Sequence, residues 1–224
     1  MSIFSYAHSN AIISAEVAES HRQVWNQLSH SGTWWTADEM LALAQTARSA
    51  FAQRHQPPWQ RTLPAPSTPL PKAAITAVER IATSPSTVDR SWVDSITAEI
   101  GDGQYVELVA VTATIAMIDI FAAAAGVEVE PLPRPADNPG QPSQQRPDGL
   151  GDIGAHVEML EPFGYANVAR ALSLVPSANQ LFRTTSVPMY SAPGMGDLVW
   201  DTPLQRTQVE LVASRVAALN ECFY

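Results

Sequence analysis

The stretch QYVELVAVTATIAMIDIFAAAAG, residues 104–126, decides the fold class of this chain. Residues 108–118 carry no charge, and their apolar side chains do not show the strict alternation of a half-buried strand. The uncharged run follows Glu107 and is far too short to span a bilayer. Gly126 suits the position just after a last helical turn, where the backbone often becomes left-handed. The pattern therefore predicts a buried core helix over residues 104–125.

The segments before this helix carry helical signals of their own. Thr36 and Glu39 have the spacing of a capping box, in which each side chain satisfies a free N–H group of the first turn. This motif predicts a helix from residue 37 to about residue 51. The proline-rich residues 57–71 cannot be helical, and apolar periodicity predicts further helices over residues 72–82 and 89–100.

The segments after the core helix contain fewer apolar residues. Residues 131–154 are rich in Pro, Gly and Asn, which is typical of a linker that runs over a protein surface. Helices are expected over residues 164–174 and 177–185, followed by a loop over residues 186–200. A last helix is expected from Thr202, because the next residue is a proline, which is favourable at the first helical position. No alternation is long enough to indicate a sheet, so the predicted fold class is all-α.

Composition excludes several classes of function. The chain is 46% hydrophobic and 16% charged, with a net charge of −9, which suits a folded domain and opposes binding to nucleic acid. The start of the chain lacks the basic and apolar segments of a secretory signal. The single cysteine excludes an intrachain disulfide. We therefore expect a cytoplasmic protein that neither binds nucleic acid nor inserts into a membrane. The histidines lack ligand spacing, so no metal site is predicted; they are His8, His21, His30, His55 and His156.

A self-match indicates that the chain contains an internal repeat. The segment QYVELVA at residues 104–110 recurs as QVELVA at residues 208–213, and each copy opens an Ala-rich helical stretch. Upstream of each copy, Pro85 and Pro176 occupy equivalent positions between two predicted helices. The same order of features occurs twice, which favours duplication over chance.

The repeat divides the chain into four predicted parts. Residues 1–30 form an N-terminal arm, weakly helical from about residue 12, and residues 31–130 form the first unit. Residues 131–154 are the linker, and residues 155–224 are the N-terminal part of a second unit. We expect the two units to superpose, with Glu107 over Glu210.

The last predicted helix carries the chemistry-bearing residues. Glu210 is followed after eleven residues by Cys222, in VELVASRVAALNECFY. This helix resembles that of the carboxymuconolactone decarboxylase/alkylhydroperoxidase (AhpD-like) family, whose signature is Glu, eleven residues, Cys-x-x-Cys, three residues and His. The resemblance implies an all-α fold of two AhpD-like helical units in tandem, with the second unit incomplete.

The sequence stops at Tyr224, just before the second cysteine of that signature would be due. Its end is also apolar, whereas chain ends are usually polar and frayed. We therefore expect residues 1–224 to be a piece of a longer polypeptide. The remaining segment would supply the second cysteine and the histidine and would complete the second unit.

The spacing of Glu210 and Cys222 sets a geometric condition. On one unbroken helix the two residues would lie about 120° apart and could not meet, so a break near Asn220 is expected. A thiol at the start of a new helix has a lowered pKa, and a nearby carboxylate can accept its proton. Such a carboxylate should be shielded from water, so we expect Glu210 to be buried near Cys222.

The resemblance implies a thiol-dependent hydroperoxide reductase with Glu210 and Cys222 in its site. Its substrates would be hydroperoxides, its electrons would come from a thiol or dithiol, and it would need no bound cofactor. In the family, the second cysteine attacks the peroxide and the first, which matches Cys222, resolves the product. The first unit has Asp119 at the position equivalent to Cys222 and is therefore redox-degenerate. The resemblance also implies a homo-oligomer.

Other interpretations stay open at this point. A cysteine-independent, decarboxylase-like enzyme could use Glu107 and Asp119 as an acid–base pair, although each could instead have a structural partner. A non-catalytic assembly subunit is the third class. Within the last helix, Glu210 could simply pair with Arg206 one turn earlier, and Cys222 could be an inert buried residue.

Overall fold

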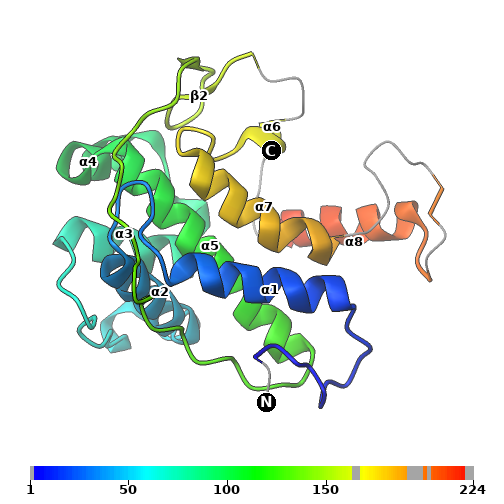
Figure 1. Ribbon diagram of the computed structural model, residues 1–224. Coiled ribbons are helices and arrows are strands. Elements are labelled where there is room, and N and C mark those ends of the chain that lie inside the picture. Colours follow the sequence, from blue (N-terminus) through cyan, green and yellow to red (C-terminus); the bar gives the residue numbers. More distant parts are fainter. Residues whose placement is uncertain (1–2, 163–166, 191–198, 201–202, 220–224) are drawn as a thin grey trace.

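The computed structural model describes residues 3–162, 167–190, 199–200 and 203–219, and within these residues the chain is an all-α protein, as predicted (Figure 1). The α-helices are α1 (Ala15–Leu28), α2 (Ala37–Ala52), α3 (Lys72–Thr83), α4 (Arg90–Ile100), α5 (Asp102–Ala124), α6 (Asn167–Arg170), α7 (Pro176–Tyr190) and α8 (Arg206–Leu219). Two short 3-10 turns are η1 (Pro58–Gln60) and η2 (Pro85–Thr87). The two-residue strands β1 (Leu150–Gly151) and β2 (Met159–Leu160) pair antiparallel, with Leu150 opposite Leu160.

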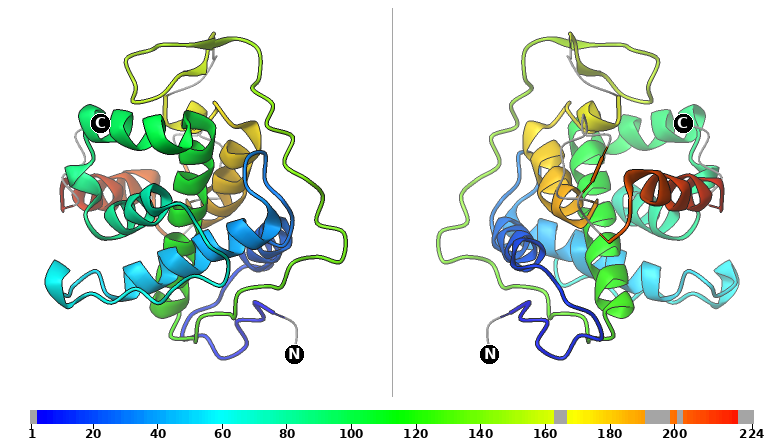
Figure 2. Two further views of the ribbon diagram at one scale, coloured as in Figure 1. Left: turned by 90° about the vertical axis from the view of Figure 1, so that its left-hand side faces the viewer. Right: turned by 90° about the vertical axis from the view of Figure 1, so that its right-hand side faces the viewer.

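Helix α5 is the centre of the bundle, and α2, α3, α4 and α7 pack around it (Figures 1 and 2). Leu108, Val111 and Ile115 are fully buried along its length. This is the one helix among the described residues that is long and apolar enough to cross a membrane, but 61% of its most apolar segment is buried inside the protein. It begins at Asp102, two residues earlier than predicted, because Gly101 alone breaks the chain with a φ of 86°.

The local signals before α5 act as predicted. Thr36 accepts a hydrogen bond from the backbone N–H of Glu39, and the Glu39 carboxylate accepts one from Thr36, so the capping box that opens α2 is confirmed. Asp89, predicted as the first residue of the next helix, is instead its N-cap: it accepts from the backbone N–H of Trp92 at 2.8 Å, and α4 begins at Arg90. Gly126 has a φ of 70° directly after the end of α5, as expected for its position.

Helix α7 packs against both α1 and α5, and its buried residues share the core of the residues before the linker. Ala178 and Leu181 of α7 lie in that core with Leu108. The predicted loop over residues 186–200 is wrong for its first five residues, because α7 continues to Tyr190 and includes Pro188. Of the helix predicted over residues 164–174, residues 164–166 lie outside the described residues, α6 confirms residues 167–170, and the prediction is wrong for residues 171–174, which form a turn.

The linker after α5 runs over one side of the molecule without helical structure (Figure 2). It is held to the loop between α1 and α2 by backbone hydrogen bonds. Ala136 donates to Ser29, Ser31 donates to Pro139, and Gln144 donates to Thr33, each at 2.8 Å. The linker therefore fixes the loop that precedes α2.

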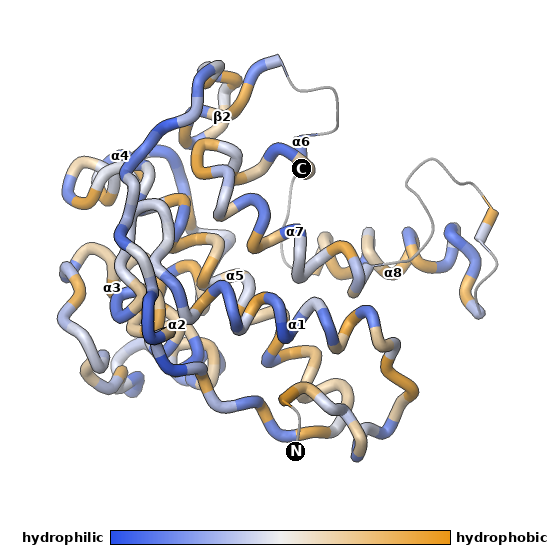
Figure 3. The backbone as a smooth tube through the Cα atoms, in the orientation of Figure 1, coloured by the Kyte–Doolittle hydropathy of each residue, from blue (hydrophilic) through white to orange (hydrophobic). Residues whose placement is uncertain are grey.

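Helix α8 lies at the edge of the molecule, away from the bundle around α5 (Figure 1). It begins at Arg206, so the predicted start at Thr202 is wrong. None of its residues is buried, and both hydrophilic and hydrophobic residues occur along its length (Figure 3). The environments of α5 and α8 thus differ within this chain, and the arrangement of two tandem units stays a prediction.

Candidate functional site

Glu210 lies on the second turn of α8, between two side chains that contact its carboxylate. The Tyr190 hydroxyl, at the end of α7, donates to Oε2 at 3.1 Å. The Nε atom of Arg206 forms an ion pair with Oε1 at 3.5 Å, which is the pairing considered as the structural alternative. The Glu210 side chain is 45% exposed, so the expectation that it is buried is wrong. It is exposed because α8 does not pack a face into the core.

Tyr190 is a member of this site that the sequence analysis did not identify. Partial burial raises the pKa of its phenol, and the hydrogen bond to the Glu210 carboxylate and the negative charge of that carboxylate raise it further. The phenol is therefore protonated at neutral pH and acts as a donor to Glu210. The sequence analysis assigned Tyr190 to a loop, because the nearby Pro188 indicates an interruption of helical structure.

Cys222 and Asn220 lie outside the described residues. The expected break near Asn220 and the approach of Cys222 to Glu210 therefore stay predictions. The site that the structure does define consists of Tyr190, Arg206 and Glu210. In this site Tyr190 and Arg206 orient the Glu210 carboxylate, which stays accessible to solvent and can exchange protons.

Glu107, the residue that the repeat matches with Glu210, has the opposite environment. It is 1% exposed, and its carboxylate accepts hydrogen bonds from the backbone N–H groups of Thr33, Trp34 and Trp35 at 2.7, 2.8 and 3.1 Å. Burial raises its pKa, while these hydrogen bonds act in the opposite direction. A Cβ atom on Gly32 would lie 2.4 Å from Oε1, so the loop closes tightly around the carboxylate. Glu107 is thus a structural acid that ties this loop to α5.

Asp119 also has a structural partner within the chain. Arg48 of α2 binds it through two parallel hydrogen bonds, each 2.8 Å long, and a further nitrogen of Arg48 donates to the Glu130 carbonyl. Glu107 and Asp119 are twelve residues apart on α5, which separates them by about 18 Å along the helix. The interpretation of these two residues as an acid–base pair is therefore wrong.

No metal-ligand role was predicted for any of the five histidines, and one of them, His21, is fully buried. Its Nδ1 atom lies 2.5 Å from the Tyr6 hydroxyl, and its Nε2 atom lies 3.3 Å from the Met189 sulfur. A thioether sulfur can only accept, so Nε2 donates to Met189 and Nδ1 accepts from Tyr6. Burial lowers the pKa of His21 to about 4, so the ring is neutral at pH 7. Phe4 and Phe121 pack edge-on against it.

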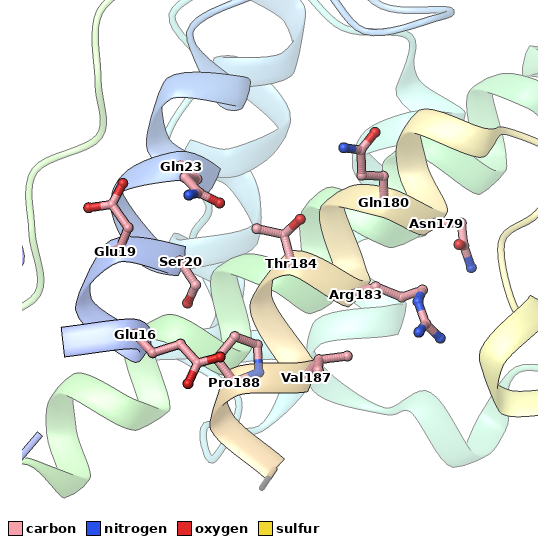
Figure 4. Close-up of a pocket in the computed structure, with 10 residues that line it drawn as sticks. All are labelled: Glu16, Glu19, Ser20, Gln23, Asn179, Gln180, Arg183, Thr184, Val187 and Pro188. Atoms are coloured by element: carbon pink, nitrogen blue, oxygen red, sulfur yellow. The ribbon is translucent and has the colours of Figure 1, made fainter. Parts of the chain in front are cut away.

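A groove of about 600 Å³ lies between α1 and α7 (Figure 4). Most of the residues that line it have polar side chains, among them Glu16 and Glu19 on α1 and Arg183 on α7. At the end of α7 it reaches Val187, one turn before Tyr190. The two walls come from opposite ends of the sequence, so no local pattern could have indicated the groove.

Among the described residues, no group of three or more His, Cys, Asp or Glu side chains is arranged to hold a metal ion. No protein-family model, curated protein or solved structure matches the chain.

Proposed function

We propose that this chain is a thiol-dependent hydroperoxide reductase of the AhpD-like type, or the N-terminal portion of one, with Glu210 and Cys222 in its site. The observation that carries the proposal is the hydrogen bond that Tyr190 of α7 donates to the Glu210 carboxylate, at 3.1 Å. This contact orients the carboxylate that the sequence motif assigns to proton transfer. The spacing of Glu210 and Cys222 supplies the second line of support.

The proposed reaction begins when Glu210 accepts the proton of the Cys222 thiol, directly or through water. Cys222 is the single cysteine of this sequence, so the proposal gives it the attacking role that the family assigns to its second cysteine. Its thiolate attacks the outer oxygen of a hydroperoxide, the O–O bond breaks, and the alkoxide leaves as an alcohol after taking up a proton. The sulfenic acid on Cys222 condenses with a thiol of the reductant and releases water. A second thiol then displaces Cys222 and leaves the reductant as a disulfide.

The second thiol is needed because Cys222 is the single cysteine of this sequence. A dithiol carrier supplies it in this proposal, or a C-terminal segment that completes the motif supplies it. The proposal includes a cytoplasmic location, where such carriers are reduced, and a homo-oligomeric assembly.

One observation favours a different function, that of a non-catalytic assembly subunit. Leu211, Val212 and Leu219 of α8 are 71%, 59% and 68% exposed, which is unusual for three large apolar residues on one short helix. The cysteine-independent acid–base alternative has no comparable support, because Glu107 and Asp119 are both held by structural partners.

A hydroperoxide-consumption assay tests the proposal. The purified chain receives tert-butyl hydroperoxide with dihydrolipoamide as electron donor, and peroxide loss is followed for the wild type and its variants. Cys222→Ser should abolish turnover, and Glu210→Gln should reduce it by about a hundredfold, the lower end of what general-base catalysis contributes. Glu99→Gln, an exposed glutamate on α4, is the matched control and should leave turnover unchanged. Turnover that survives in Cys222→Ser would contradict the proposal, and no turnover in any form would favour the assembly subunit.

A further inference from the structure

Residues 3–11, the leading segment, precede α1 and lie at the C-terminal end of α5 (Figure 1). Phe4 is 2% exposed, and its ring packs edge-on against the rings of Trp25 and His21. The Tyr6 hydroxyl lies 2.5 Å from the Nδ1 atom of His21. Two side chains of the leading segment therefore contact the same buried histidine.

The backbone of the leading segment is left-handed at both of these aromatic residues. Phe4 has a φ of 53°, and Tyr6 has a φ of 49°. Bulky side chains rarely adopt this region, because the Cβ atom crowds the carbonyl oxygen. Such a backbone persists only where the surrounding contacts fix it. The docking of the two rings therefore holds a conformation that would relax if the segment were released.

The docked position of the segment requires a neutral His21 ring. Nδ1 accepts a hydrogen bond from Tyr6 and Nε2 donates one to Met189, which uses both nitrogens of the neutral tautomer. His21 is fully buried, and this burial lowers its pKa to about 4. An added proton would place a charge against the rings of Phe4 and Phe121. The charged ring would regain its hydration only when the leading segment moves away.

Among the described residues, the elements packed on His21 place one titratable group against its ring. This group is Tyr6, and burial and the nearby Glu130 carboxylate both raise the pKa of its phenol, so it stays protonated. Helix α5 contributes Phe121 and α7 contributes Met189 to the surroundings of the ring, and neither side chain titrates. Acidification therefore changes the charge at this point of the core through His21.

Two charged side chains hold the backbone of the leading segment rather than its rings. Oε1 of Glu130 accepts from the backbone N–H of Phe4 at 2.7 Å. Arg22 of α1 donates to the carbonyl of Phe4 at 3.4 Å. Because a carboxylate also takes up a proton on acidification, Glu130 is the group from which the effect of His21 must be distinguished.

We propose that the leading segment is a pH-sensitive latch: protonation of His21 releases Phe4 and Tyr6 from the bundle and uncovers the aromatic rings beneath them. The open ring regains its ordinary proton affinity, so the open form gains as the pH falls from about 6.5 toward 4. The opening is local, because α1, α5 and α7 keep their contacts with one another. The latch does not depend on the proposed function, since Glu210 takes no part in it.

Hydrogen exchange of the leading segment in the full chain measures the opening. The backbone N–H groups of Phe4, Ser9 and Asn10 are hydrogen-bonded in the closed position, so their exchange reports the open fraction once the intrinsic rate at each pH is divided out. With a pKa of about 4 in the closed form and near 6.5 in the open form, the opening constant should rise about eightfold from pH 7 to pH 5.5. Mass spectrometry of a peptide covering residues 3–11 follows this change, and a peptide from α5 should keep its protection.

Variants at three positions assign the pH dependence to one group. His21→Gln cannot take up a proton, so exchange of the leading segment should be equal at the two pH values, whatever its level. Glu130→Gln keeps an acceptor for Phe4 and removes the carboxylate, so it should keep the eightfold rise. His55→Gln, at an exposed histidine, is the matched control and should also keep it.

The outcomes decide between a latch and other causes of acid sensitivity. A rise confined to residues 3–11 that is lost in His21→Gln and kept in Glu130→Gln supports the latch. A rise that is lost in Glu130→Gln would overturn it, as would the absence of any rise in the wild type. An equal loss of protection in α5 would also overturn it, because the whole bundle would then be opening. Protection of α5 at pH 7 shows whether His21→Gln is folded, and the profiles of the wild type and Glu130→Gln test the latch without it.

Discussion

Two glutamates that are equivalent in the sequence repeat have different roles in the structure. Glu107 is buried and accepts hydrogen bonds from three backbone N–H groups and from the Ser177 hydroxyl, whereas Glu210 is half-exposed and has two side-chain partners. A carboxylate has about four acceptor positions, so the four donors around Glu107 leave no free position for a substrate proton. Glu210 retains access to solvent, so the chemistry proposed for the site can involve Glu210 and not Glu107.

His21 makes stability depend on pH in a predictable direction. Its pKa is about 4 in the folded chain and near 6.5 in the unfolded chain, so the unfolded chain binds the proton more tightly. The folded state therefore loses stability as the pH falls from about 6.5 toward 4, by at most about 3 kcal/mol from this group. Urea unfolding at a series of pH values measures the effect.

The matched variants isolate the contribution of His21 from that of other groups. His21→Gln should lower stability at pH 7 but should show a shallower decline between pH 6.5 and 4. His55→Gln, at an exposed histidine, should keep the wild-type decline. If the decline in His21→Gln is as steep as in the wild type, the ring is not held neutral by burial.

At the scale of elements, α5 and α8 share a sequence pattern but not an environment. Leu108 and Leu211 both follow the repeated glutamate, yet Leu108 is fully buried and Leu211 is 71% exposed. An amphipathic or apolar pattern specifies that a helix can pack, but not which surface will cover it. The repeat therefore predicted two helices correctly, and their surroundings had to come from the fold.

This pair of leucines gives a direct comparison of the two helices. Leu108→Ala should cost about 3 kcal/mol of unfolding free energy, because it removes buried methyl groups and leaves a cavity. Leu211→Ala should cost less than about 0.5 kcal/mol, as expected at an exposed position. Chemical denaturation of both variants measures the difference. Equal losses would mean that α8 is covered as deeply as α5, as in a complete second unit or an assembly.

At the scale of the whole molecule, the predicted boundary between two units does not separate two hydrophobic cores among the described residues. Leu174 and Leu181, which follow the linker, lie in one cluster with Leu43 and Leu108, which precede it. Helix α7 thus contributes to the stability of the first hundred residues, and α8 contributes little buried surface. Tandem units, a homo-oligomer and a cytoplasmic location remain predictions.

Hydrogen exchange should show this division of the molecule. Peptides from α5 and α7 should both be protected, because local opening of either helix disrupts the shared core. Peptides from α8 should exchange about a hundredfold faster or more, since it buries no side chain. Mass spectrometry of peptides covering these three helices checks the prediction. Similar protection of α8 and α5 would show that another surface covers α8 in solution.

The sequence by itself determined the features that depend on neighbouring residues. Local signals account for the all-α class, the capping box of α2, the course of α3 and α4, and the left-handed Gly126 that follows the end of α5. These signals act within one or two helical turns, so they can be read without knowing the rest of the fold. The pairing of Arg206 with Glu210 one turn away belongs to the same class.

Only the tertiary structure decided the features that join distant parts of the chain. The backbone donors of Glu107 lie more than seventy residues before it, and the partner of Asp119 is Arg48. Pro188 is accommodated inside α7, whose end is anchored by the contact of Met189 with His21. Glu210 is exposed because α8 packs no face against the bundle, and no local sequence pattern encodes that arrangement. Burial and long-range hydrogen bonds depend on the packing of all elements together, and a local sequence pattern does not specify that packing.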